Sequence, residues 1–229
     1  MNDNHIPLKR KTQPILNAPP VVSYIIVGCV FMFMAIRFLP QDIAAFIFLK
    51  LAYIPARFTE AGAASIDPLA TALSPLGYTL LHNDWMHLLV NMGMFLAFGS
   101  AIARRLDVPA FIFLYCLGAL GGVVISTFFD PTSIIPMIGA SAAISAMLGA
   151  LSVLSFIPRV GETPPRPFHH KQTAITFIVI WLVMNIITGL LPSTLFNDVG
   201  RIAWEAHIGG FIAGAVAIRF LLPKLVEDE

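Results

Sequence analysis

Apolar stretches long enough to cross a bilayer alternate with short polar segments along this chain. The first stretch, VVSYIIVGCVFMFMAIRFL at 21–39, follows a polar tail that ends in prolines. Later stretches are separated by RRLDVP, DPTSIIP, RVGETPPRPFHHK and PSTLFNDVGR, which carry charges and helix breakers. Because a spanning helix needs roughly 20 apolar residues, the pattern predicts six spans. They lie at 21–39, 86–103, 108–128, 138–157, 173–192 and 202–222.

Two stretches near the N-terminus need separate interpretation. The run at 21–39 is too long for the apolar region of a signal peptide, and the small-residue sequence AGA at 61–63 lies far downstream, so we expect a retained anchor. The stretch IAAFIFLKLAYIPA at 43–56 is short, contains Lys50 and ends near Pro55. It is predicted to lie at the membrane interface or to dip into it, and not to span.

Composition agrees with this assignment and narrows the class of protein. Hydrophobic residues make up 57% of the 229 residues, charged residues only 12%, and the mean hydropathy is +0.81. We therefore expect an all-α polytopic membrane protein, with tails at 1–20 and 223–229 around a six-span domain at 21–222. The net charge of +1 gives no indication of nucleic-acid binding, and Cys29 and Cys116 lie in apolar runs, which implies no disulfide framework.

Lysine and arginine positions predict the orientation of the spans. Ten of the fourteen cations fall before 21–39, in the loops around Arg104 and Arg166, and from Arg219 onward. A six-span chain places these four segments on one side, which the positive-inside rule identifies as the cytoplasm. We therefore expect a multi-pass protein of a bacterial inner (plasma) membrane with both termini cytoplasmic. The loops at 41–81, 129–137 and 193–201 are then outside.

Polar side chains capable of chemistry gather at the outer ends of three spans. The second span opens with LHNDWMHLLVN, in which His87 and Asn91 are four residues apart and share a helix face. Ser141 lies near the start of the fourth span, and His207 lies one or two turns into the sixth. All four enter from the same side, so we expect them at one depth.

Small residues indicate that the fourth and sixth spans touch. Ser141 and Gly149 fall on one face of small residues in the fourth span, and Gly210 and Gly214 form a second such face in the sixth. Faces of this kind let helix backbones approach closely in a membrane. His207 precedes Gly210 by three residues and shares its face, so a hydrogen bond between Ser141 and His207 is predicted.

A serine and a histidine paired in this way form a nucleophile and its base. The imidazole of His207 would accept the hydroxyl proton of Ser141 and later return it to the leaving amine. Charge developing on a substrate carbonyl would need donors, which the Asn91 amide, the His87 imidazole and the first N–H groups of the fourth span supply. His82 is expected to make a supporting, structural hydrogen bond.

Three motifs stand out when these residues are viewed together: HNDWMHLLVN at 82–91, GASAAISAMLG at 139–149 and AHIGGFIAG at 206–214. Their combination resembles the rhomboid intramembrane serine proteases, and the resemblance covers nearly the whole chain. It implies a six-transmembrane-helix rhomboid-like bundle with a catalytic dyad and no metal or cofactor. In that reading the nucleophile is Ser141, the general base and acid is His207, the oxyanion donors are Asn91 and His87, the supporting residues are His82 and Gly139, and the helix-packing glycines are Gly149, Gly210 and Gly214.

Three features depart from the family pattern. Ala142 stands where a glycine usually follows the nucleophile, and Ser145 stands where an aromatic residue often packs on the histidine. The Trp-Arg pair common in the first loop is also missing. None of these changes removes a proton-transfer group, but they alter the surroundings of the oxyanion and of the histidine.

Other classes of membrane protein fit less well. A metalloprotease would need His-Glu-x-x-His, and HNDWMH has four residues between its histidines and no glutamate after the first. An aspartyl protease would need two intramembrane aspartates, but every aspartate falls in a loop or at a span end. A haem-binding electron carrier could use His87 and His207 as axial ligands, and it would show a visible absorbance band.

The sequence therefore predicts an intramembrane serine endopeptidase that cleaves transmembrane segments of membrane proteins near their outer ends, within the lipid bilayer. The alternative is a catalytically inactive rhomboid-like protein that binds membrane clients. Such relatives usually lack the serine or the histidine, and this chain has both. The substrate and the oligomeric state are left open.

Overall fold

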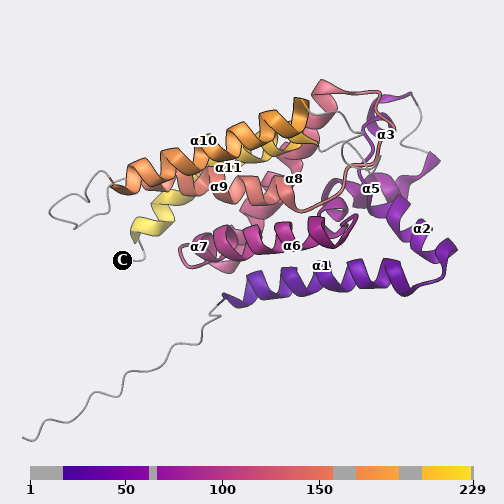
Figure 1. Cartoon of the computed structure of the whole chain (residues 1–229), viewed down its shortest axis with the longest axis horizontal. Coiled ribbons are helices and arrows are strands. Elements are labelled where there is room, and N and C mark those ends of the chain that lie inside the picture. Colours follow the sequence, from indigo (N-terminus) through magenta and orange to yellow (C-terminus); the bar gives the residue numbers. More distant parts are fainter. Residues whose placement is uncertain (1–17, 62–65, 157–168, 191–202, 228–229) are drawn as a thin grey trace, which may run out of the picture.

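The computed structural model describes residues 18–61, 66–156, 169–190 and 203–227, which form a bundle of long helices with shorter helices at one end (Figure 1). The long helices are α1 (Pro20–Phe38), α6 (Trp85–Met94), α8 (Val108–Phe129), α9 (Ser141–Phe156), α10 (His169–Leu190) and α11 (Trp204–Glu227). A π-helical turn at Phe95–Gly99 joins α6 to α7 (Ser100–Ala103), and the shorter helices are α2 (Gln41–Leu51), α3 (Ala56–Thr59) and α5 (Pro68–Gly77).

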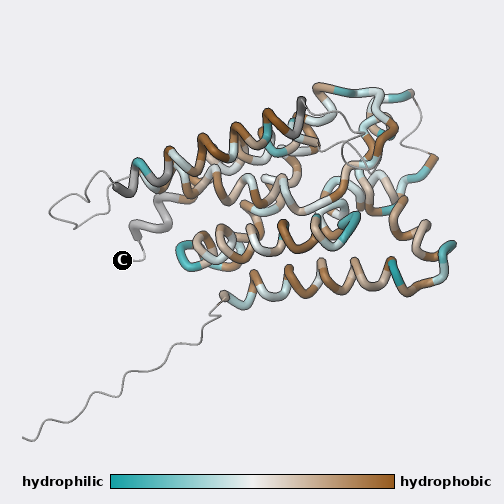
Figure 2. Tube along the Cα trace, viewed as in Figure 1, coloured by the Kyte–Doolittle hydropathy of each residue, from teal (hydrophilic) through white to brown (hydrophobic). Residues whose placement is uncertain are grey.

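Three helices of the described chain are long and apolar enough to cross a membrane: Pro20–Phe38, Trp85–Ala103 and Val108–Phe129. Ser141–Phe156 and Ile175–Ile187 are shorter apolar helices. Figure 2 shows hydrophobic residues along the long helices and hydrophilic residues at several of the turns between them. The expectation of an all-helical, multi-pass membrane protein is confirmed, and the count of six spans stays a prediction.

Three helix ends differ by three residues or more from the predicted spans, and one of them is the start of α10, at His169 and not at 173. The fourth span was expected from residue 138, but α9 begins at Ser141 because the backbone of Gly139 has a positive φ of 113°, which a right-handed helix does not contain. The sixth span was expected to end at residue 222, whereas α11 continues to Glu227, into the stretch assigned to the C-terminal tail.

Close backbone contact joins α9 to α11, as the small-residue pattern predicts. A Cβ atom added at Gly210 would overlap the carbonyl oxygen of Ala142, and one added at Gly214 would overlap that of Ala146. A Cβ atom at Gly149 would overlap a carbonyl oxygen of α11 in the same way. These three positions therefore accept only glycine without moving the helices apart.

Helix α8 completes this packing, which the sequence analysis did not predict. A Cβ atom at Gly122 would lie 2.6 Å from the methyl carbon of Ala142, and one at Gly121 would lie 2.7 Å from the carbonyl oxygen of Gly209 on α11. The methyl group of Ala142 thus fills the contact between α8 and α9. Helices α8, α9 and α11 form a glycine-packed core, and this name is kept below for the three helices together.

Two buried tyrosines anchor the segment between α1 and α6, where the Trp-Arg pair is missing. Tyr53 exchanges two backbone hydrogen bonds with Met137, at 3.1 and 2.7 Å, and its hydroxyl lies 2.5 Å from that of Thr127. The hydroxyl of Tyr78 donates to the carbonyl of Ala119 at 2.9 Å. Both tyrosine side chains are 1% exposed. The segment is therefore fastened to α8 and to the chain that leads into α9.

The apolar stretch at 43–56 forms α2 and the turn that follows it, and α2 is too short to span. Lys50, near its end, lies 2.5 Å from Asp67, the N-cap of α5, whose carboxylate also accepts from the backbone N–H of Ala70 at 3.1 Å. The ammonium of Lys50 lowers the pKa of Asp67. This cation is used to join two short helices, and its predicted place at the membrane interface stays a prediction.

The arginine-bearing turn after α7 and the short helices lie at opposite ends of the bundle. The turn after α7, with Arg104 and Arg105, lies at the same end as the C-terminus, and α2, α3 and α5 gather at the other (Figure 1). Several segments from which the orientation was predicted lie outside the described residues. They are Lys9 to Lys11, the loop with Arg159 and Arg166, and the loop at 193–201. Which end faces the cytoplasm stays a prediction.

Candidate active site

Ser141 and His207 form a hydrogen-bonded pair where α9 meets α11. Ser141 is the first residue of α9, and His207 lies in the first turn of α11. The serine Oγ is 2.7 Å from the histidine Nε2. Both residues are partly exposed. The predicted bond is present because the contact at Gly210, less than one turn beyond His207, brings the two helix starts together.

Gly139 shapes the approach to the serine. Its φ of 113° is rarely adopted by residues with a side chain, and its N–H donates to the carbonyl of Tyr78 at 2.9 Å. A Cβ atom at this position would lie 2.7 Å from His87 Nε2 and 3.8 Å from Ser141 Oγ. The absence of a side chain at Gly139 makes room for the His87 ring next to Ser141.

His87 presents a donor toward that space. The carboxylate of Asp84 caps α6 by accepting from the backbone N–H of His87 at 2.8 Å, and this bond lowers the pKa of Asp84. The backbone N–H of Asn83 donates to His87 Nδ1 at 3.4 Å. Because Nδ1 accepts, the tautomer assigned to a neutral ring carries its proton on Nε2, the atom beside Gly139.

Asn91 and His82 lie on either side of His87 along the chain, and both are buried. The amide nitrogen of Asn91 donates to the carbonyl of His87 at 2.9 Å, and it carries a second proton. The His82 ring packs edge-on against the His87 ring, with centroids 5.1 Å apart. The four predicted polar residues on α6, α9 and α11 thus gather at one end of the bundle. The hydrogen bond expected of His82 is not formed within the described part of the chain, because both of its ring nitrogens are buried without a partner and the ring packs on His87 instead.

Asn185 on α10 is a site residue that the sequence analysis missed. Its Oδ1 lies 2.6 Å from Nδ1 of His207, on the side of the ring opposite Ser141. The signal that could have found it is an amide within the apolar run ITFIVIWLVMNII, because polar side chains inside a membrane span face protein partners.

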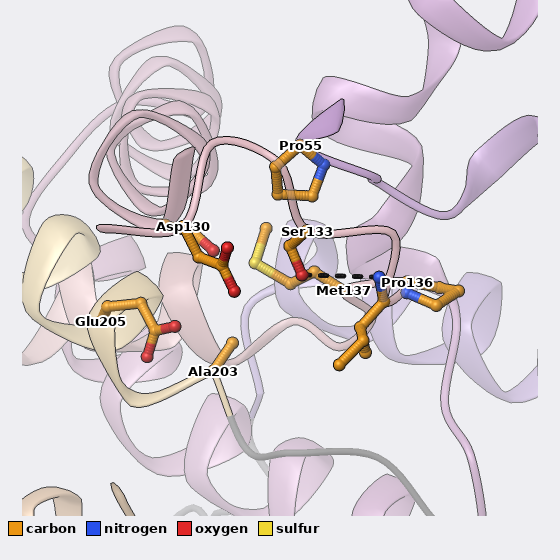
Figure 3. A pocket seen from close by; sticks show the side chains of 9 residues that line it. Pro55, Asp130, Ser133, Pro136, Met137, Ala203 and Glu205 are labelled. Atoms are coloured by element: carbon orange, nitrogen blue, oxygen red, sulfur yellow. Dashed lines mark hydrogen bonds between the residues drawn. The ribbon is translucent and has the colours of Figure 1, made fainter. Parts of the chain in front are cut away.

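A small pocket lies close to this site but does not include the serine or the histidine. In Figure 3 the side chains of Asp130 and Glu205 are drawn on one side of it and those of Pro55 and Pro136 on the other. Ser133 accepts from the backbone N–H of Ile135 at 3.4 Å along its wall. Among the described residues, no three His, Cys, Asp or Glu side chains gather as a metal ion would require.

Comparison with known proteins places the sequence of this chain in a family. The family model described as "Rhomboid domain" matches residues 71–224, which include Ser141, His207 and Asn185. RHOMBOID-like protein 5 of Arabidopsis thaliana is 30% identical over 134 residues, covering 58% of this chain and 39% of the relative. Rhomboid protease GluP of Bacillus subtilis (strain 168) is 30% identical over 146 residues, covering 63% of this chain and 25% of the relative.

Rhomboid protein 1, mitochondrial, of Saccharomyces cerevisiae is 25% identical over 170 residues, covering 71% of this chain and 45% of the relative. The matched part of the chain thus spans between a quarter and about half the length of these three relatives. The relatives come from a plant, a yeast and a bacterium, so they do not select one kind of membrane. Since the family model matches well over half of the chain, this integral membrane protein belongs to the rhomboid family.

Proposed function

We propose that this rhomboid is an intramembrane serine protease that cleaves transmembrane segments of other membrane proteins. The observation that carries the proposal is the 2.7 Å hydrogen bond between Ser141 Oγ and His207 Nε2. The Bacillus relative is named Rhomboid protease GluP, which supports the same activity. A serine and an imidazole at this distance are the minimum machinery for nucleophilic attack on an amide.

In the proposed mechanism, Ser141 Oγ attacks the carbonyl carbon of the scissile peptide while its proton passes to His207 Nε2. The carbonyl oxygen becomes an oxyanion, and donors aimed at it lower the barrier. Those donors are His87 Nε2, the second N–H of the Asn91 amide and the backbone N–H groups that begin α9, which have no acceptor within their helix. The tetrahedral intermediate then expels the amine, which takes the proton from His207. A water molecule, activated by the same imidazole, hydrolyses the acyl-enzyme.

The site lies at the end of the bundle where α2, α3 and α5 gather, opposite the turn after α7 and the C-terminus (Figure 1). The cation pattern of the sequence supports an orientation with both termini in the cytoplasm. In this orientation the enzyme would cut a substrate near the outer end of its span. The substrate helix must unwind there, because helical hydrogen bonds and side chains shield a scissile amide.

Cleavage of a single-span model substrate in liposomes tests the proposal. We expect Ser141→Ala and His207→Ala each to abolish cleavage while the protein stays folded and inserted. Ser155→Ala is the matched control, because that hydroxyl lies on the same helix but donates to the carbonyl of Leu151 at 2.8 Å. Near-normal turnover by either site variant would refute the dyad.

The second candidate function is a rhomboid that binds membrane clients without cutting them. Retention of the serine and the histidine at bonding distance argues against it. Binding of the same substrate without cleavage by the unaltered protein would support it.

A further inference from the structure

Asn185 occupies an unusual position on α10. The aliphatic residues around it, Val183 and Ile186 among them, are between 40 and 55% exposed, as expected of side chains that face lipid. Asn185 is 5% exposed, and it is the one buried side chain among those described on this helix. An amide on a membrane helix is costly to bury without partners. The Asn185 amide therefore faces inward, where hydrogen-bond partners from Trp181 and His207 are available.

Two hydrogen bonds fix the orientation of this amide. Its nitrogen donates to the carbonyl of Trp181, one turn earlier, at 2.8 Å, so its oxygen faces Nδ1 of His207 at 2.6 Å. The Trp181 ring is stacked on Phe211 of α11, with centroids 4.8 Å apart and planes at 22°. The turn of α10 that carries Asn185 is thus held against the turn of α11 that follows His207.

This orientation determines which nitrogen of His207 carries the proton. An amide oxygen only accepts hydrogen bonds, so Nδ1 must be the donor in a neutral ring. Nε2 then has a free lone pair directed at the Ser141 hydroxyl, 2.7 Å away. The opposite tautomer would place two protons between Nε2 and the serine and leave Nδ1 facing the amide oxygen without a proton.

We propose that Asn185 is a positioning residue that holds the imidazole of His207 in the tautomer and rotation needed to accept the serine proton. This inference rests on the proposed protease function and extends its dyad to a hydrogen-bonded row of Ser141, His207 and Asn185, in which the amide accepts a hydrogen bond and takes no proton. No aromatic ring is available at Ser145 to support the histidine, and the amide of α10 supplies support from the other side. Asn185 acts through His207 and does not touch the substrate.

Three variants separate this role from ordinary packing. Asn185→Leu keeps the volume and removes the acceptor, Asn185→Asp keeps the acceptor, and Ile186→Ala alters the next, outward-facing residue as the matched control. We expect Asn185→Leu to lower kcat about 10²-fold with KM unchanged, the cost of misplacing a catalytic group by about 1 Å. Asn185→Asp should retain activity within about 10-fold, because a carboxylate oxygen also accepts from Nδ1. Ile186→Ala should match the unaltered enzyme.

The outcomes distinguish failure of this inference from failure of the proposed function. An unaltered protein that cleaves nothing refutes the protease. An active protein with unchanged kcat in Asn185→Leu, or with equal losses in Asn185→Leu and Asn185→Asp at unchanged thermal stability, overturns the positioning role. If Asn185→Leu does not fold, ¹⁵N NMR of the unaltered protein decides, with the His207 signals identified by their loss in His207→Ala. A proton on Nδ1 supports the inference, and a proton on Nε2 in the neutral ring overturns it.

Discussion

The glycine-packed core and α10 are held in the molecule in opposite ways. In the core, the backbones of α8, α9 and α11 touch at positions where no side chain fits. Helix α10 directs aliphatic side chains outward and contributes one buried amide among its described residues. In a membrane, an apolar side chain gains no hydrophobic free energy by contacting a neighbouring helix instead of lipid. Close backbone packing and interhelical hydrogen bonds must therefore hold the helices together.

The difference explains how the site is divided between the two regions. Ser141 and His207 belong to the core, so their separation is fixed by backbone contacts. The acceptor for the other side of the imidazole comes from α10, which is held by the Asn185 bond and by the Trp181–Phe211 stack. An interhelical hydrogen bond in a membrane contributes on average about 0.6 kcal/mol. The position of the histidine is therefore robust, whereas its orientation depends on a weakly held helix.

The largest effect should follow from adding volume to the core. Gly210→Val would drive a side chain into the carbonyl of Ala142, and because the obstacle is backbone, the helices must separate. We expect loss of thermal stability and of all cleavage. Val179→Ile adds one methylene to an exposed position of α10 and should change neither. Equal tolerance of both changes in thermal unfolding experiments would remove the distinction between the two regions.

An intermediate effect should follow from removing the oxyanion donors of α6. Helix α6 packs against the glycine-packed core, since Leu88 and Met92 are buried in one apolar cluster with residues of α8, α9 and α11. His87→Ala and Asn91→Ala should therefore each lower cleavage about 10²–10³-fold without unfolding the protein. Fluorophosphonate labelling of Ser141 should persist, because activation of the nucleophile does not need them. If labelling falls as far as cleavage, the two residues act on the structure and not on the oxyanion.

The smallest effect concerns the start of α6. Asp84→Ala removes its N-cap and should lower stability by about 1 kcal/mol. The His87 N–H lowers the pKa of Asp84, so this contribution is complete above the unfolded pKa of about 3.9 and is lost as the pH falls through the lower folded value. Asp84→Asn should therefore lose less stability on acidification than the unaltered protein. Identical acid unfolding curves for the two proteins would show that the cap carries no charge-dependent stability.

The sequence predicts those parts of the site that depend on spacing within one helix. His87 and Asn91 share a face because they are four residues apart, and the glycines of α11 lie on the face that carries His207. The contact with α8 could also have been predicted, since Gly118 and Gly122 repeat the same spacing.

Other features depend on conformation or on distant partners, and no spacing reveals them. The positive φ of Gly139 delays the start of α9 to Ser141. Tyr53 anchors the first loop through Met137, far along the chain, although no known motif marks it. Asn185 is visible as a polar residue in an apolar run, but its partner could not be deduced because it lies on another helix.

Fluorophosphonate labelling followed by mass spectrometry shows whether Ser141 is an activated nucleophile, and it needs no known substrate. We expect one adduct, on Ser141, which disappears in His207→Ala and persists in Ser155→Ala. We also expect labelling to be slowed in Asn185→Leu and nearly normal in Asn185→Asp. An unlabelled Ser141 in folded, unaltered protein, or labelling that is unchanged in His207→Ala, would contradict the claim that this pair is an activated nucleophile.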